Sequence, residues 1–260
     1  KVATTPIDPS IDVIDGLEKI LAQSSVAAEN VTSMLHATTI ATTAVLERKG
    51  APTGLITTAG FRDVLIIGRQ KRYETYDLYI SKPKPLVQRR HIAEVQERVA
   101  ADGSVVVELD MESVDEAIDA IVASGRETVA VSLLHAYANS AHERSIRDRI
   151  SKRAPELSVS ISSVVSPMFR EYERTNTTVT NAYVRPVVDR YIGHLEAALQ
   201  TQGFRDDLLI MQSNGGLVSP AIARDFPVRI IESGPAAGIL MCSEVGRAAG
   251  FNEILTFDMG

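Results

Sequence analysis

The chain has 260 residues, of which 45% are hydrophobic and 23% are charged, as in ordinary globular domains. Its net charge of -6 argues against nucleic-acid binding, which requires a basic surface. The single cysteine excludes an intramolecular disulfide, and no apolar run approaches the length of a membrane span. We therefore predict one large or two modest domains, no nucleic-acid or membrane partner, and a cytoplasmic location.

The first part of the chain alternates segments of helical periodicity with short apolar segments typical of strands. We predict helices at 11–22, 42–50, 114–125 and 140–150, and strands at 53–58, 104–110, 128–137 and 157–165. Residues 31–40 are predicted to form a strand that runs into a polar loop. Residues 60–105 carry many charges, several tyrosines and two Lys-Pro pairs, so we expect an irregular insertion there.

The second part begins with a long helical tract from Phe169 to Gly203, which Pro186 should kink or break. Strands are predicted at 207–213, 228–231 and 254–258, with helices at 219–226 and from about Pro235. Strands that alternate with helices through short glycine turns favour an α/β fold with a mainly parallel sheet. We place the domain boundary between residues 1–165 and 166–260.

Three loops each follow an apolar segment: SNGG (213–216), ESGPAAG (232–238) and FDMG (257–260). Ligands of open α/β sheets bind at the carboxyl ends of the strands. Glycines there admit a phosphate, and the amides at a helix N-terminus attract it. Any one such loop is also an ordinary turn. Their order, however, resembles the nucleotide-binding core shared by actin, the heat-shock chaperone ATPases and the sugar kinases.

A closer resemblance covers nearly the whole chain. The segments HATTIATTAVLERKGAPTGLITTAGFRDVLIIGRQKR (36–72), REYERTNTTVTNAYVRP (170–186), IMQSNGGLVS (210–219), ESGPAAG and FDMG are similar, in this order, to the hydantoinase A/5-oxoprolinase family. The resemblance implies an actin-like (ribonuclease H-like) ATPase fold, in an excerpt of a longer chain. It also implies ATP and Mg²⁺ as cofactors, a cyclic amide substrate, a second subunit or domain like hydantoinase B, and an oligomer.

The implied reaction couples ATP hydrolysis to activation of a lactam or imide carbonyl, as in hydantoin or 5-oxoproline. Phosphorylating the carbonyl oxygen would create a leaving group and expose the carbon to water, which requires a clamp for Mg²⁺ and phosphate. Two other readings stay open: the ATP-using subunit of a ketone carboxylase or a small-molecule kinase, and a non-catalytic module of the same fold.

The loops and the resemblance together define the candidate site residues. Catalytic roles fall to Asp258, His36 and Thr38, and Asp258 is also the metal candidate because a carboxylate at a strand end suits Mg²⁺. The nucleotide-binding candidates are Ser213, Asn214, Gly215, Gly216, Ser233, Gly234, Gly238 and Gly260. The substrate candidates are Thr39, Arg62, Arg69, Arg170, Glu171 and Arg174. Arginine binds oxyanions in a bidentate manner, although a solvated charged face remains the alternative for these residues.

Three features bear on whether the chain is active. Ala37 stands where the family usually has glycine, which is conservative if its φ is negative and strained if it is positive. The family's first phosphate loop is absent and the second stops at Gly260, so we expect this excerpt alone to bind ATP poorly and to be inactive. Cys242 lies among apolar residues, and we expect a buried, inert thiol.

Overall fold

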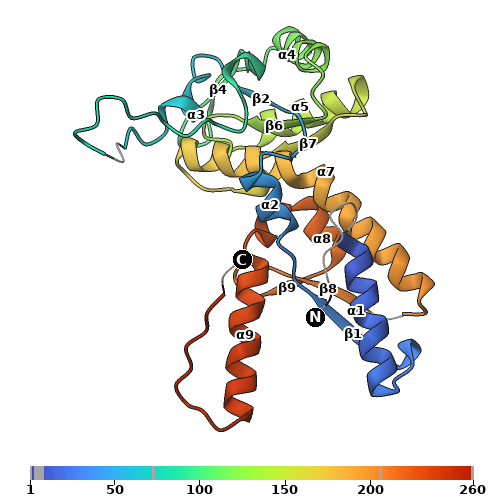
Figure 1. Cartoon of the computed structure of the whole chain (residues 1–260). Coiled ribbons are helices and arrows are strands. Elements are labelled where there is room, and N and C mark those ends of the chain that lie inside the picture. The colour runs from blue at the N-terminus through green and yellow to red at the C-terminus, as the bar shows by residue number, and fades with distance from the viewer. Residues whose placement is uncertain (1, 3–8, 72–73, 205–206, 259–260) are drawn as a thin grey trace. The chain divides into compact units, whose positions relative to one another are not determined.

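The computed structural model describes residues 2, 9–71, 74–204 and 207–258 (Figure 1). The chain forms two compact units, which we call unit 1 (Lys1–Lys49 with Val187–Gly260) and unit 2 (Gly50–Pro186). Unit 1 therefore combines both ends of the chain, and unit 2 is the continuous segment between them. The sequence-based boundary after residue 165 stays a prediction.

Unit 2 is built on a four-stranded parallel sheet in the order β3-β2-β6-β7. Its strands are β2 (Thr53–Thr58), β3 (Ile92–Val95), β6 (Thr128–Ser132) and β7 (Ser158–Ile161). Around it lie α3 (Val64–Ile67), η2 (Arg89–His91), α4 (Met111–Ala123), α5 (Ala141–Arg153), α6 (Ser162–Val165) and the hairpin of β4 (Arg98–Val99) with β5 (Val105–Val107).

The two faces of this sheet bury different neighbours, because successive side chains of a strand point to opposite sides. Ile56, Val129 and Val131 belong to a core cluster with residues of α4 and α5. Leu55 and Ala130 belong to a second cluster that includes Val179 and Ala182 of α7 (Glu171–Thr201). Helices therefore cover both faces, which explains why every residue of β2 is buried.

Helix α4 shows how local sequence sets an element's ends. The Asp110 side chain accepts hydrogen bonds from the amides of Glu112 and Ser113, both at 3.2 Å, so the helix begins at Met111. Gly125 follows the helix with a φ of 67°, a conformation that glycine adopts without strain. The predicted glycine stop is confirmed.

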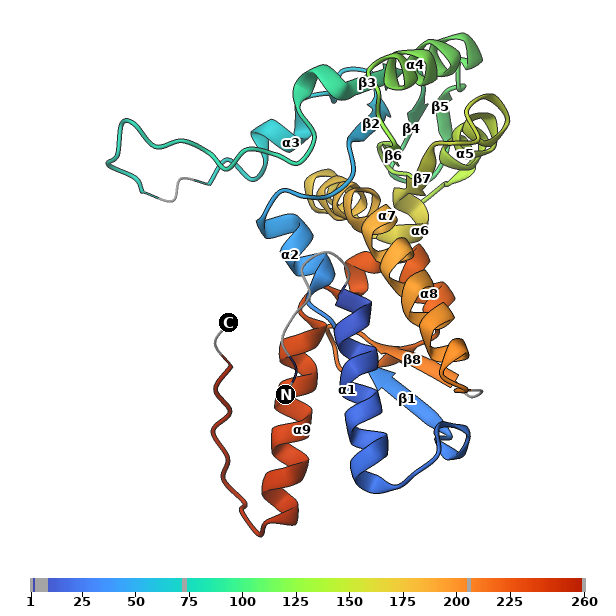
Figure 2. The ribbon, with the colours of Figure 1, turned by 45° about the vertical axis from the view of Figure 1, so that its right-hand side comes forward.

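Unit 1 contains a smaller, three-stranded sheet in the order β1-β8-β9. Strand β1 (Ser33–His36) runs parallel to β8 (Asp207–Met211), and β9 (Leu217–Val218) runs antiparallel to β8. The surrounding elements are α1 (Pro9–Ser24), η1 (Ala28–Asn30), α2 (Ile40–Leu46), the later part of α7, α8 (Pro220–Asp225), η3 (Pro227–Ile230) and α9 (Ser233–Ala248) (Figure 2). Val188, Tyr191, Ile192, Ile210 and Ile230 form most of its buried core.

The long helix α7 is continuous from Glu171 to Thr201, and Pro186 lies inside it. The prediction of a helical tract is confirmed, but a break at Pro186 is not found. Val184 and Val188, on either side of the proline, are fully buried. Packing of these flanking residues offsets the hydrogen bond that proline cannot donate.

Several predicted elements are wrong in detail. The insertion predicted at 60–105 contains β3, because Ile92 and Val95 are buried beside β2, and between α3 and η2 the described residues 68–71 and 74–88 form no helix or strand. Residues 162–165 form α6 instead of continuing the strand. Residues 228–231 lie mostly in η3, a 3₁₀ helix that Pro227 begins because its fixed φ suits a helical first turn.

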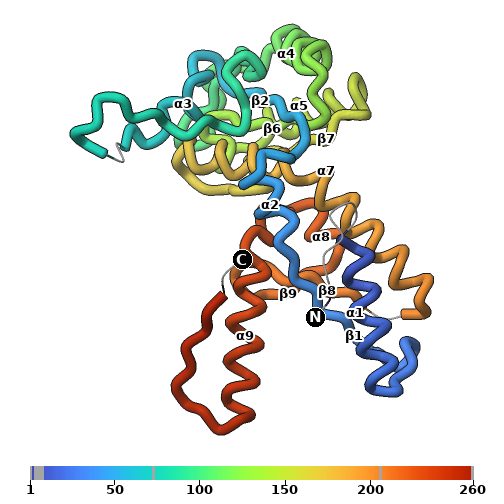
Figure 3. Tube along the Cα trace, in the orientation of Figure 1, coloured from blue at the N-terminus to red at the C-terminus, as the bar shows by residue number. Residues whose placement is uncertain are grey.

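The C-terminal segment also departs from prediction. Residues 254–258 are extended but pair with none of the described strands (Figure 3), and Leu255 is 94% exposed. A strand requires a neighbour to accept its backbone hydrogen bonds, and an apolar run alone does not supply one. Cys242 is exposed on α9, so the predicted buried thiol is wrong. Among the residues placed by the structure, no helix is both long and apolar enough to cross a bilayer.

Candidate functional site

Two parallel strands of unit 1 bring two of the predicted loops to one edge. Strand β1 ends at His36 and β8 ends at Met211, with His36 paired in register with Ile210. The HATT segment (36–39) and the SNGG loop (213–216) therefore leave the sheet at the same, carboxyl edge. This is the edge at which open α/β folds bind ligands.

The HATT segment is ordered by its own polar groups. The hydroxyl of Thr38 accepts a hydrogen bond from the amide of Ile40 at 3.2 Å, which holds the entry to α2. Ala37 is not among the described residues with positive φ, so its methyl group is tolerated without backbone strain. Of the two alternatives left open by the sequence, a conservative or a strained replacement of glycine, the structure supports the conservative one at Ala37.

His36 is half-buried against α7. Its Nε2 lies 2.8 Å from the hydroxyl of Tyr191, whose side chain is only 5% exposed, and the two ring centroids are 5.8 Å apart. Burial lowers the pKa of His36 from 6.5 to about 4, because the charged imidazolium loses hydration there. At neutral pH the ring is therefore uncharged, and His36 can hydrogen-bond a ligand but does not offer it a positive charge.

The ESGPAAG segment is attached to the HATT segment by side-chain hydrogen bonds. The buried hydroxyl of Ser233 donates to the carbonyl of Thr38 at 3.0 Å and accepts from its amide at 3.3 Å. The amide of Glu232 donates to the hydroxyl of Thr42 at 3.0 Å. Helix α9, which begins at Ser233, thus has its N-terminus fixed beside the end of β1.

The glycines of ESGPAAG differ in what they allow. A Cβ added to Gly234 would lie 2.9 Å from Cγ2 of Thr39, so the close approach of the two segments requires glycine. A Cβ added to Gly238 would meet no described atom within 4 Å, so protein packing does not require glycine there, and its role in nucleotide binding stays a prediction. Glu232 has a φ of 65°, a strained conformation for a residue with a side chain.

The SNGG loop is the tight turn between β8 and β9. Asn214 Oδ1 accepts from the amide of Gly216 at 2.9 Å, and Gly215 has a φ of 82°. The amide and the hydroxyl of Ser213 each donate to the carbonyl of Arg229 at 2.8 Å. A Cβ on Gly215 would lie 3.3 Å from Cδ1 of Leu240 on α9, so the turn packs against that helix. Three predicted segments, HATT, SNGG and ESGPAAG, are therefore brought together within unit 1.

The fourth segment is not part of this assembly in the described structure. Asp258 is exposed in the extended chain after α9, and Gly260 lies outside the described residues. Within the part of the chain that the structure places, no group of three or more His, Cys, Asp or Glu side chains could hold a metal ion. Asp258 remains a single candidate carboxylate.

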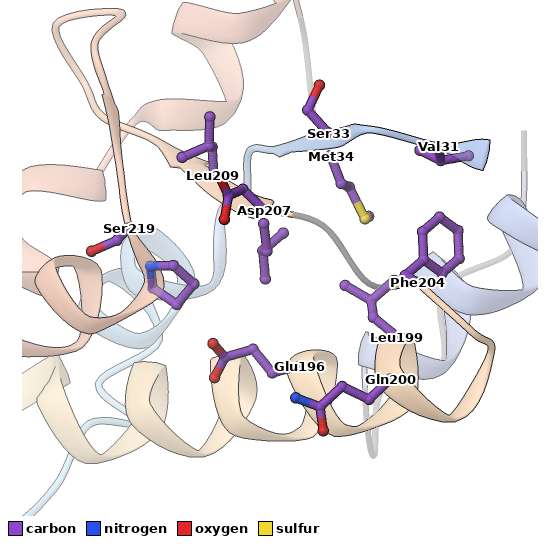
Figure 4. A pocket seen from close by; sticks show the side chains of 12 residues that line it. Val31, Ser33, Met34, Glu196, Leu199, Gln200, Phe204, Asp207, Leu209 and Ser219 are labelled. Carbon is purple, nitrogen blue, oxygen red and sulfur yellow. The ribbon is translucent and has the colours of Figure 1, made fainter. Parts of the chain in front are cut away.

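A pocket of about 390 Å³ lies at the opposite end of the same sheet. Figure 4 shows Ser33 and Met34 of β1 on one side of it and Glu196 and Gln200 of α7 on the other. Asp207, the first residue of β8, also lines it. The Asp207 carboxylate would repel a phosphate and Glu196 is engaged in an ion pair with Arg224, so this pocket suits a nucleotide less well than the carboxyl edge does.

The substrate candidates all lie in unit 2 except Thr39, which precedes α2. The side chain of Arg62 donates to the carbonyl of Arg89 at 3.3 Å, and Arg69 forms an ion pair with Glu173. Arg170 lies over the ring of its neighbour Phe169 at 5.4 Å, and Glu171 is exposed at the start of α7. Arg62 and Arg69 are partly accessible and keep donors for a ligand.

Arg174 is different because it is 1% exposed and its donors are used within the protein. It donates to the hydroxyl of Ser162 at 3.1 Å and to the carbonyls of Met168 and Leu133 at 3.1 and 2.6 Å. Glu143 accepts from the same hydroxyl at 2.6 Å and from the amide of Leu133 at 2.9 Å. This geometry supports a structural role for Arg174, joining α7 to β6 and α6.

Sequence reasoning missed the partners of these residues. Tyr191 is 155 positions from His36, and Ser233 is 195 positions from Thr38. Glu143 is fully buried, which raises its pKa, although its sequence neighbours are charged as on a surface helix. No local pattern could have identified these contacts.

Residues 1–154 match the model of the hydantoinase/oxoprolinase N-terminal region, and residues 174–260 match the hydantoinase/oxoprolinase model. The chain belongs to the hydantoinase/oxoprolinase family. The predicted family is confirmed.

The chain is similar to two relatives in this family and to two solved structures. Caprolactamase subunit alpha of Pseudomonas jessenii is 32% identical over the whole chain, which covers 38% of that protein. The 5-oxoprolinase of Saccharomyces cerevisiae is 32% identical over 89% of the chain and 20% of its own length. The crystal structure of the ATP-dependent caprolactamase matches with a TM-score of 0.89, at 30% identity over the whole chain and 38% of the solved chain. Nucleotide-free acetone carboxylase matches with a TM-score of 0.85, at 26% identity over 95% of the chain and 37% of the solved chain.

These likenesses confirm the actin-like α/β ATPase fold. The chain spans well under half the length of the relatives that it matches. Both solved relatives are described as ATP-dependent, so ATP use is a property of the family.

Proposed function

We propose that the full-length protein is an ATP-dependent hydrolase of cyclic amides of the hydantoin or 5-oxoproline type. The observation that carries the proposal is the meeting of HATT, SNGG and the start of α9 at the carboxyl edge of β1 and β8. Relatives named caprolactamase and 5-oxoprolinase support a lactam as the substrate.

The residues at this edge are suited to a nucleotide. Asn214 of the SNGG turn is exposed, and α9 directs its first amides toward the same edge. Gly234 permits contact with Thr39 that any side chain would block. We assign the phosphates of ATP to these backbone groups, where ATP would supply the phosphoryl group that activates the amide carbonyl.

For Mg²⁺ we propose Asp258. Magnesium in ATP-dependent enzymes is commonly held by one or two carboxylates together with phosphate oxygens and water. An exposed carboxylate that forms no ion pair with the other described residues suits that arrangement.

His36 and the threonines of HATT are proposed to position the reacting groups. The neutral imidazole can donate or accept a hydrogen bond but carries no charge to offset that of a phosphate. The hydrogen bond with Tyr191 holds the ring in place. Thr38 is anchored through its backbone to Ser233, which leaves Thr39 as the exposed hydroxyl of the segment.

We further propose a second, hydantoinase B-like subunit or domain, an oligomeric assembly and a cytoplasmic location. Relatives described as subunits, such as caprolactamase subunit alpha, support the partner. Gel filtration of the protein expressed together with a hydantoinase B-like protein, compared with gel filtration of the protein alone, tests the assembly.

A ketone carboxylase subunit is the second candidate, because the fold matches acetone carboxylase with a TM-score of 0.85. ADP release by the full-length protein distinguishes the two. We expect 5-oxoproline or a hydantoin to stimulate it, and Asp258→Asn to abolish the Mg²⁺-dependent turnover without unfolding the protein. Stimulation by acetone with bicarbonate alone would favour the carboxylase, and no stimulation by any cyclic amide would contradict the proposal.

A further inference from the structure

Unit 2 contains a pocket that the proposed ATP chemistry does not use. It has a volume of about 400 Å³ and lies between the end of α3, the chain at 68–71, the segment 82–85 and Tyr172 of α7. This volume falls within the range of small-molecule sites, which is roughly 300–1,000 Å³. All of its lining residues belong to unit 2, whereas HATT, SNGG and α9 belong to unit 1.

The pocket concentrates positive charge on a chain whose net charge is -6. Of its twelve described lining residues, four are cationic and none is Asp or Glu. These four are Arg69, Lys71, Lys82 and Lys84. Glu173 pairs with Arg69 through Nε, and Lys71 and Lys82 add positive charge beside that pair. Such an excess favours an anionic ligand.

Part of the pocket lining is apolar. Ile66 and Ile67, at the end of α3, are 39% and 47% exposed, and Leu65 beside them is buried. Pro83 and Pro85 line the pocket together with these residues. Covering exposed isoleucine with ligand carbon is favourable by the hydrophobic effect, so the lining suits an anion with an apolar body better than a bare inorganic ion.

The pocket is held in shape from two sides. Lys82 Nζ donates to the carbonyls of Ile66 and Ile67 at 3.3 and 3.2 Å, which fixes the segment 82–85 to the end of α3 and leaves one ammonium proton. Gly68 has a φ of 56°, and a Cβ there would lie 3.6 Å from the ring of Tyr172. A preformed pocket lowers the cost of ordering on binding.

We propose that this pocket is a binding site for a small organic anion, in which a carboxylate or phosphate group meets the cations and an apolar body covers α3. The two sources of negative charge share this chemistry. None of its described lining residues belongs to HATT, SNGG or α9, and Arg69 is the one residue that it shares with the substrate candidates.

Binding to the full-length protein, measured by ligand-observed NMR, tests the proposal with four probes. Benzoate and phenyl phosphate place a carboxylate and a phosphate on the same aromatic ring. Benzamide keeps the ring but has no charge, and inorganic phosphate has the charge but no ring. We expect saturable binding of benzoate or phenyl phosphate with a Kd of about 1 mM or tighter. Benzamide and inorganic phosphate should each bind at least about threefold more weakly, and the tighter aromatic anion identifies the group preferred.

Matched variants locate the site. Lys71→Gln should weaken benzoate binding about threefold to tenfold, whereas Lys152→Gln, an exposed lysine of α5 in the same unit, should not change it. Ile67→Ser should weaken benzoate but not inorganic phosphate. Unchanged unfolding midpoints will show that the variants are folded. Equal binding of benzoate and benzamide, equal effects of the two lysine variants, or no saturation below about 10 mM would overturn the proposal.

Discussion

Acidification should destabilise unit 1 through His36. The pKa of this ring is lowered from 6.5 to about 4 by burial. The unfolded chain therefore binds a proton between these values that the folded chain does not, and the free energy of unfolding falls as pH decreases through this window. A difference of this size corresponds to at most about 3 kcal/mol, of which about 2 kcal/mol is lost between pH 7 and pH 5. Because the ring is half-buried, water reduces these values.

Two measurements test this prediction. The first follows the ring resonances of His36 by NMR and should give a midpoint near 4. The second compares urea unfolding of the chain with that of His36→Gln, whose stability relative to the wild type should rise by about 2 kcal/mol from pH 7 to pH 5. Tyr191→Phe is the control, because it keeps the burial and removes the 2.8 Å hydrogen bond, and the midpoint should stay low. A midpoint near 6.5, or parallel pH profiles for wild type and His36→Gln, would refute the reasoning.

Three further predictions follow from single contacts. Arg174→Met should reduce the free energy of unfolding by about 3–5 kcal/mol, because it leaves buried acceptors unpaired; Arg69→Gln, on an exposed pair, should change it by less than about 1 kcal/mol, and equal effects would exclude the structural role. Gly234→Ala should cost about 1–3 kcal/mol through overlap with a methyl group 2.9 Å away and impair ATP turnover, whereas Gly238→Ala should be neutral in both assays. Glu232→Gly should stabilise the chain by about 1 kcal/mol by relieving a φ of 65°; a loss of stability in thermal unfolding would show that the Glu232 side chain contributes more than the strain costs.

Much of the fold could be predicted from local patterns. The buried strand at 53–58, the amphipathic helix that Gly125 ends and the long helix through 169–203 all have strong periodicity, and the structure contains each of them. The errors occur where tertiary contacts decide. Residues 228–231 are β-branched and apolar except for Arg229, but they lie mostly in a 3₁₀ turn in unit 1, and 254–258 pair with none of the described strands.

The segments of the candidate site could be predicted from the sequence, but the side-chain contacts between them could not. Glycine-containing turns after apolar strands indicated SNGG and ESGPAAG, and parallel pairing of β1 with β8 brings SNGG to the HATT edge. The hydrogen bonds that join Ser233 to Thr38 connect residues almost 200 positions apart, which no local pattern encodes. The charged segment around Arg174 suggested an accessible side chain. Its burial depends on the tertiary packing of unit 2 around α7, which the local sequence does not show.

HATT, SNGG and the start of α9 are proposed to form a nucleotide site. Hydrogen exchange of the full-length protein, with and without a non-hydrolysable ATP analogue and Mg²⁺, tests it most directly. We expect slower exchange of backbone amides in residues 36–42, 213–217 and 232–240 when the nucleotide is bound. Unchanged exchange in these three segments, together with protection elsewhere in the chain, would contradict it.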